Sequence, residues 1–241
     1  MSTTEQHSLA KSITLHLLPG LLIGLFYLLV GIPIARMIEF PTLFGLILSV
    51  IFVLVPFELG YLLYQSRKHG NSLLSVISYR EPMPRSRFVV LVSFLFLWAF
   101  LLSSFLSPVD EFIRRSLFSW IPDWFLVTAG FGEYPCSTQT ITILCSIVVT
   151  GIIAPIVEEI YFRGYLLPRI SRFGIWAPVI NMILFAFYHF WSPWQAVTRF
   201  VFYLPVVYAV WKKRNIYISI WEHTLGNTTG GVLTLLQITL R

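Results

Sequence analysis

Long apolar runs, separated by short polar or charged segments, are the dominant pattern of this chain. About 20 apolar residues cross the hydrocarbon core of a bilayer as an α-helix. By that measure the runs predict seven membrane-spanning helices. They cover residues 12–35, 42–65, 87–106, 138–162, 174–191, 195–211 and 216–239. Because the runs are too long and too uniformly apolar for barrel strands, we expect an all-α, polytopic transmembrane helix bundle with its active site inside.

Composition agrees with this pattern, because 56% of the 241 residues are hydrophobic and only 12% are charged. Such a composition excludes an ordinary soluble domain. No small-residue cleavage pattern closes the first apolar run, so we expect it to remain as the first transmembrane helix. Cys136 and Cys145 are nine residues apart, which is roughly 13 Å if both lie on one helix. This separation is too long for a disulfide, so we expect free thiols.

The net charge of +6 has its explanation in membrane topology, because the basic residues cluster between apolar runs. The positive-inside rule places the Arg- and Lys-rich segment between the second and third spans in the cytoplasm. With seven spans, the N-terminus is then cytoplasmic and the C-terminus external. Residues 107–137 fall outside, where their tryptophans and mixed charges predict a short amphipathic helix in the membrane interface. The alternative is an eighth, re-entrant span.

Polar side chains inside the predicted spans identify the candidate functional residues. A charged side chain at the bilayer centre costs about 2.5–3.5 kcal/mol on insertion scales, so several in one bundle must face one another or a wet cavity. The set comprises His16, Glu58, Glu158, Glu159, Arg163, Asn181, His189, Arg199, Glu222, His223 and Asn227.

Two adjacent carboxylates and an arginine occur in the stretch EEIYFR. The step from Glu159 to Arg163 is i to i+4, so these side chains lie on one helix face and are expected to pair. Glu158 lies about 100° further round the helix and is free to point elsewhere. The alternative is that both acids are solvated at the cytoplasmic interface.

Two further stretches place polar groups one helical turn apart. FAFYH ends on His189, which either contributes to a polar site or marks the outer interface while Phe185 packs in the core. HTLGN places His223 and Asn227 on one helix face, where they serve either a site or helix packing, with small neighbouring residues allowing close approach.

The stretches EEIYFR, FAFYH and HTLGN occur in this order and match the motifs EExxxR, FxxxH and HxxxN. On these residues the chain resembles the intramembrane proteases related to the CAAX-processing Rce1 and bacterial Abi proteins, known as the CPBP family. The resemblance covers residues 138–241, the expected catalytic core of a single membrane domain over residues 1–241. Residues 1–137 would supply N-terminal spans and the external segment, and the expected location is a bacterial plasma membrane.

The resemblance also implies roles in peptide hydrolysis. Glu158 would be the general base that activates water, assisted by His189, while His223 and Asn227 would stabilise the oxyanion. The neighbouring ion pair of the EEIYFR stretch would orient the site. These residue types suit the reaction, which needs a base, an oxyanion stabiliser and a proton for the leaving amine.

Zinc is the one cofactor that the resemblance raises. Glu158, His189 and His223 would leave an open fourth position on the metal. However, the chain has no HExxH helix and each ligand comes from a different span, so we expect hydrolysis without a metal. The expected partners are membrane lipid and a peptide or protein substrate, prenylated or hydrophobic, and no nucleic acid.

Two other functional classes fit the composition. A transporter would use the buried acids and histidines as proton relays, although no inverted repeat supports it. A non-catalytic protein of the same fold would bind a partner or confer bacteriocin immunity. Glu58 and Glu222 lie outside the three motifs. Glu58 is expected to pair with His16 or Arg199 or to face the cavity, and Glu222 to lie at its rim.

Overall fold

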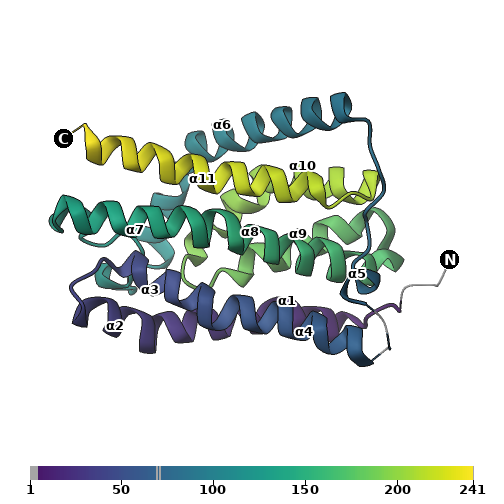
Figure 1. Cartoon of the computed structure of the whole chain (residues 1–241), viewed down its shortest axis with the longest axis horizontal. Helices are drawn as coiled ribbons and strands as arrows, with labels where there is room; N and C mark the ends of the chain where they lie inside the picture. Colours follow the sequence, from purple (N-terminus) through teal and green to yellow (C-terminus); the bar gives the residue numbers. More distant parts are fainter. Residues whose placement is uncertain (1–4, 69, 71, 241) are drawn as a thin grey trace.

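The computed structural model describes residues 5–68, 70 and 72–240, and its described residues form an all-α bundle as predicted. The long helices run along one axis, with α1 (Leu9–Phe26) beginning at one end and α11 (Tyr217–Thr239) ending at the other (Figure 1). The helices between them are α2 (Ile32–Met37), α3 (Thr42–Ser49), α4 (Val55–Lys68), α5 (Leu73–Val76), α6 (Arg85–Leu117), α7 (Cys136–Val148), α8 (Ala154–Glu158), α9 (Ala177–Tyr188) and α10 (Ala196–Lys213).

Four helical stretches of the described residues are long and apolar enough to cross a membrane. They are Leu9–Met37, Thr42–Lys68, Arg85–Leu117 and Cys136–Tyr188. The fourth contains the predicted span 138–162 and most of the span 174–191, with a helical corner at Gly174, which has φ +55°. Helices α10 and α11 lie where the last two spans are predicted, but they fall outside this set, so the count of seven or eight spans stays a prediction.

The third predicted span ends too early, and no separate amphipathic helix follows it. Helix α6 continues without a break to Leu117, with Pro108 inside it. Glu111 pairs with Arg114 at i+3 and with Arg115 at i+4, which supports the helix over the charged stretch. Beyond α6, the only helical elements of residues 118–135 are short 3₁₀ turns, at Asp123–Phe125 and Phe131–Glu133.

Three of the long helices contain a π-helical turn shortly before a proline. A proline inside an α-helix lacks an N–H and its ring clashes with the carbonyl four residues earlier. A π-turn relieves this clash, because the N–H just before the proline bonds the carbonyl five residues back. The turns and their prolines are Tyr27–Gly31 with Pro33, Val50–Leu54 with Pro56, and Val149–Ile153 with Pro155.

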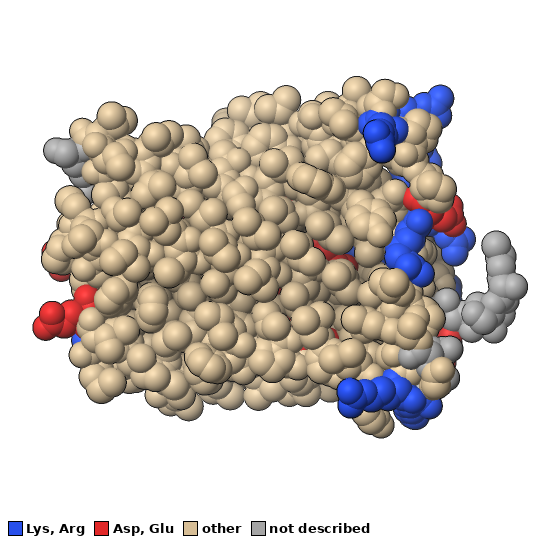
Figure 2. Space-filling view, in the orientation of Figure 1, with Lys and Arg blue, Asp and Glu red and all other residues tan. Residues whose placement is uncertain are grey.

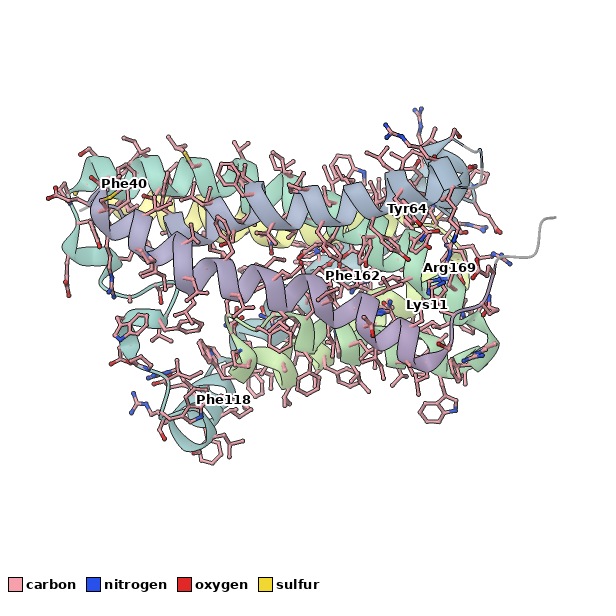
Figure 3. All side chains as sticks on the ribbon, turned by 90° about the horizontal axis from the view of Figure 1, so that it is seen from below. Lys11, Phe40, Tyr64, Phe118, Phe162 and Arg169 are labelled. Carbon is pink, nitrogen blue, oxygen red and sulfur yellow. The ribbon has the colours of Figure 1, made fainter. Side chains whose placement is uncertain are left out.

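Charge separates along the axis of the bundle. Lys and Arg gather at the end where α1 begins, while the middle is almost free of exposed charge (Figure 2). Lys11 and Arg169 lie toward this same end (Figure 3). It also receives the last turns of α4 and α10, each of which carries two basic residues. This distribution is the one that the positive-inside rule associates with a cytoplasmic face.

Two smaller features of the fold are the state of the cysteines and the close crossing of the first two long helices. Cys136 and Cys145 are free, as predicted. Gly31 and Gly45 bring the first two long helices into backbone contact, because a Cβ added at Gly31 would lie 2.6 Å from the Gly45 carbonyl oxygen. Small residues at such a crossing are typical of membrane helix packing.

Candidate active site

A cavity of about 340 Å³ lies inside the bundle, between α6, α8, α10 and α11. Four of the six candidate residues predicted from the sequence line it: Glu158, His189, His223 and Asn227. The two others, Glu159 and Arg163, lie behind the cavity wall and are completely buried. The fold therefore gathers the three motifs at one place and sorts their members into cavity-facing and supporting residues.

The two adjacent glutamates occupy different environments, as expected for neighbouring residues that point about 100° apart on a helix. Glu158 is the last residue of α8, and Glu159 begins a π-helical stretch that runs to Leu166. Glu158 points its carboxylate to the cavity, with Oε2 3.9 Å from Nε2 of His223. Such π-helical turns inside α-helices are frequent at functional sites.

Glu159 is held by contacts from three helical segments. Its Oε1 accepts hydrogen bonds from the Tyr203 hydroxyl and from Nδ1 of His223, both at 3.0 Å. Its Oε2 lies 3.3 Å from Nε of Arg163, which confirms the predicted i,i+4 ion pair. The contact with His223 was not predicted, since it joins residues 64 positions apart. Glu159 thus orients the His223 ring directly.

Arg163 is the largest completely buried side chain of the described residues. Its guanidinium carbon lies 3.8 Å from the Phe185 ring centroid and 5.2 Å from that of Tyr203. Aromatic faces attract a desolvated cation, so the rings and Glu159 together compensate its buried charge. Phe162, in the interior of the bundle, packs edge-on against Phe185 at 4.9 Å (Figure 3).

The hydrogen bonds of the two histidines define which ring nitrogen faces the cavity. Nδ1 of His189 lies 2.9 Å from the Phe185 carbonyl oxygen, and because a carbonyl only accepts, Nδ1 carries the hydrogen. In the neutral ring, Nε2 of His189 is then a proton acceptor. Nδ1 of His223 donates to Glu159, so its Nε2 becomes a hydrogen-bond donor only when the ring is doubly protonated. The carboxylates of Glu158 and Glu159 supply the opposite charge for that form.

Asn227 compensates a backbone defect beside the site. Its Nδ2 donates to the Thr150 carbonyl oxygen at 3.0 Å. In a regular helix that carbonyl would receive the Ala154 N–H, but this N–H bonds Val149 instead, and Pro155 has none to offer. The second hydrogen of the Asn227 amide stays available in the cavity wall.

Further polar residues outside the motifs also line the cavity, among them Arg199, Tyr203 and Glu222. Arg199 hydrogen-bonds Ser192 and Gln195 and forms no ion pair within the described residues. Glu222 is 2% exposed, so it lies inside the site and not at a wet rim as expected. Their positions within apolar runs were the available sequence signal for Arg199 and Glu222.

Glu58 and His16 belong to separate buried networks, so the predicted pairing between them is wrong. Glu58 accepts a hydrogen bond from the Tyr188 hydroxyl at 3.0 Å, and it lies outside the cavity wall. His16 bonds the Ser12 carbonyl and receives the Asn181 amide at 2.9 Å. Both networks join the first two long helices to α9 and fix the helices around the site.

The candidate zinc ligands do not form a metal-binding group in this arrangement. Among the residues that the structure describes, no three His, Cys, Asp or Glu side chains stand in position to hold an ion. Nδ1 of His189 bonds a backbone carbonyl and Nδ1 of His223 bonds Glu159, so Nε2 is the ring nitrogen of each histidine that faces the cavity. Metal-bound histidines commonly make such Nδ1 contacts as well, so these hydrogen bonds do not distinguish the two chemistries. Hydrolysis without a metal stays a prediction.

Comparisons with known proteins place the site within one matched stretch. Residues 140–229 match the family described as Type II CAAX prenyl endopeptidase Rce1-like, and this range contains all six candidate residues. UPF0177 protein YxdF from Lactococcus lactis subsp. lactis (strain IL1403) is 30% identical over 89 residues. That match covers 37% of this chain and 50% of the relative, so the chain spans about half the length of that protein. No solved structure matches the chain.

Proposed function

We propose that this chain, whose residues 140–229 carry an Rce1-like CAAX endopeptidase family domain, is an intramembrane endopeptidase. Its substrate would be a membrane-associated peptide or a CaaX-like tail, and it would act in a bacterial plasma membrane with its N-terminus cytoplasmic. One observation carries the proposal: Glu158, His189, His223 and Asn227 come from distant parts of the chain and face one cavity.

In the proposed reaction, a water molecule in the cavity loses a proton to Glu158 and attacks the carbonyl carbon of the scissile peptide bond. Nε2 of His189, a proton acceptor in the neutral ring, assists by orienting that water. The attack breaks the carbonyl π-bond and leaves a tetrahedral oxyanion. Collapse of this intermediate expels the amine, which takes up the proton held by Glu158.

The oxyanion would be stabilised by two donors in the cavity wall. Asn227 offers its second amide hydrogen, and a doubly protonated His223 offers Nε2–H. Glu159 and Arg163 would act as positioning residues, since neither lines the cavity and Glu159 fixes the His223 ring. Pre-oriented donors of this kind are among the largest single contributions to hydrolytic rates.

The test compares Glu158→Gln with Glu58→Gln in detergent or liposomes. Both glutamates are buried in the same bundle, but only Glu158 lines the cavity. With a fluorogenic CaaX-type peptide and a library of unmodified peptides, we expect Glu158→Gln to abolish cleavage and Glu58→Gln to retain it. Cleavage by the Glu158→Gln protein would overturn the assignment. If cells that express the Glu158→Gln protein keep the phenotype conferred by the wild type, a partner-binding role is supported instead.

A further inference from the structure

The cavity is deeply buried at one end and more exposed at the other. Its deep end is formed by Glu158, Tyr203 and Glu222, each less than 5% exposed. Its open end includes Asn227, which is exposed, and Phe100, which is 36% exposed. A peptide therefore reaches the candidate catalytic residues from the side of Phe100 and Asn227.

The positions of the lining residues along their helices show which end of the bundle this is. Ser103 lies about 27 Å along α6 from Arg85, at 1.5 Å per residue. Asn227 lies about 15 Å from the start of α11 in the same direction. Leu46 is one turn from the start of α3, at the opposite end from Lys68. Ser103 and Asn227 thus lie near the middle of the bundle and Leu46 lies beyond it. All three are farther from the cationic end than Glu222 of the deep end, which lies about 7–8 Å from the start of α11.

Two other segments cover the helical stretch that follows α8 at the cationic end of the bundle. Every residue from 161 to 168 is buried. The segment before α6 covers it, because the Ser78 N–H bonds the Gly164 carbonyl at 2.8 Å. The N-terminal segment closes the other side, where the His7 N–H bonds the Arg169 carbonyl at 2.8 Å. A chain arriving at this end would have to displace both segments.

We propose that the substrate reaches the site from the external half of the membrane, so that its class is a peptide exposed at the outer face and not a cytoplasmic tail. The positive-inside rule makes the cationic end cytoplasmic and the open end external. This inference rests on the protease function proposed above. The walls near the opening are aromatic, with Phe96, Phe100 and Phe202, and Arg199 lies among them as a cation without an ion pair in the described residues. These features suit an apolar peptide that carries a carboxylate.

Cysteine labelling tests the direction of access without relying on catalysis. In a Cys136→Ser/Cys145→Ser background, Ser103→Cys reports on the opening and Ser75→Cys on the cationic end, since Ser75 is exposed in α5. A charged, membrane-impermeant maleimide is applied to right-side-out and inside-out vesicles. We expect Ser103→Cys to react only in right-side-out vesicles and Ser75→Cys only in inside-out vesicles. The exposed Cys136 of the wild type, at the start of α7, should report the same face as Ser103→Cys.

Reaction of Ser103→Cys from the cytoplasmic side, or from neither side while Ser75→Cys and Cys136 report the expected orientation, would overturn the proposal. Reactivity of Cys136 from the cytoplasmic side would overturn it as well, by inverting the topology. A second arm adds a cleavable peptide to one face of oriented proteoliposomes, and we expect turnover only from the external face. External labelling without any cleavage would refute the protease and leave the direction of access standing.

Discussion

Removing one member of the Glu159–Arg163 pair should destabilise the protein, and removing both should restore much of the loss. Both side chains are completely buried, and Oε2 of Glu159 lies 3.3 Å from Nε of Arg163. At that distance the Coulomb attraction is about 5 kcal/mol for an effective dielectric constant near 20. Breaking a buried pair by removing one partner typically costs about 3–5 kcal/mol, because the remaining charge is uncompensated.

The double-mutant cycle uses Glu159→Gln, Arg163→Met and their combination. Gln keeps the shape and can still accept the Tyr203 hydrogen bond, while Met keeps much of the arginine volume among the aromatic rings. We expect each single variant to lower the free energy of unfolding by about 3–5 kcal/mol and the double variant to lower it by clearly less than their sum. Denaturant unfolding in detergent, followed by tryptophan fluorescence, measures the three differences.

Measuring peptide cleavage as well as unfolding distinguishes the contribution of Glu159 to stability from its positioning of His223. The double variant should recover stability but not cleavage, because the His223 ring has lost its carboxylate partner. Additive losses in the double variant, within about 0.5 kcal/mol, would show that the two charges do not interact and would refute the reasoning. Full cleavage by the double variant would refute the positioning role of Glu159.

Three more predictions concern single positions. Asn227→Asp should lower turnover about 10²–10³-fold and also lower the midpoint of thermal unfolding, because it replaces a donor beside a carbonyl with an acceptor; peptide cleavage and unfolding in detergent check the two effects. Gly31→Leu should prevent accumulation of folded protein, since its side chain would meet the facing backbone, whereas Gly60→Leu has open space and should accumulate normally in size-exclusion profiles. Burial lowers the pKa of His7 from 6.5 to about 4, so the folded state binds fewer protons than the unfolded state. The stabilising contribution of neutral His7 is complete above pH 6.5 and is lost as the pH falls toward 4. Limited proteolysis of the N-terminal segment should therefore accelerate over that pH range, but not in His7→Phe.

How much of the site could be predicted depends on how far apart in the sequence the interacting residues lie. The Glu159–Arg163 pair follows from helix periodicity and is confirmed. The bond from His223 to Glu159 joins α11 to the π-helical stretch that follows α8, and no local pattern indicates it. Arg199 and Glu222 stand out in the sequence as charges within apolar runs, but only the packing of the helices shows that they face the same cavity.

The ends of the helices depend on side-chain pairs along the helix as well as on hydropathy. Hydropathy ends the third span where polar residues begin, yet α6 continues to Leu117 because Glu111 and the arginines after it pair along the helix. Hydropathy measures transfer into lipid, whereas a helix persists wherever its backbone bonds and side-chain pairs remain favourable. The predicted interfacial helix was therefore the last third of a longer one.

The adjacent glutamates of the EEIYFR stretch illustrate how an apolar bundle can hold two carboxylates for two purposes. Glu159 receives two hydrogen bonds and an ion pair, so its charge is fixed and its geometry is transmitted to His223. Glu158 faces the cavity, where its ion-pair contact with His223 is long, at 3.9 Å. A carboxylate that faces a confined cavity can contact a water molecule there, whereas one buried behind the cavity wall cannot. Adjacent residues on a helix point about 100° apart, which separates these two environments. In the proposed reaction, this places Glu158 at the water molecule and Glu159 behind His223.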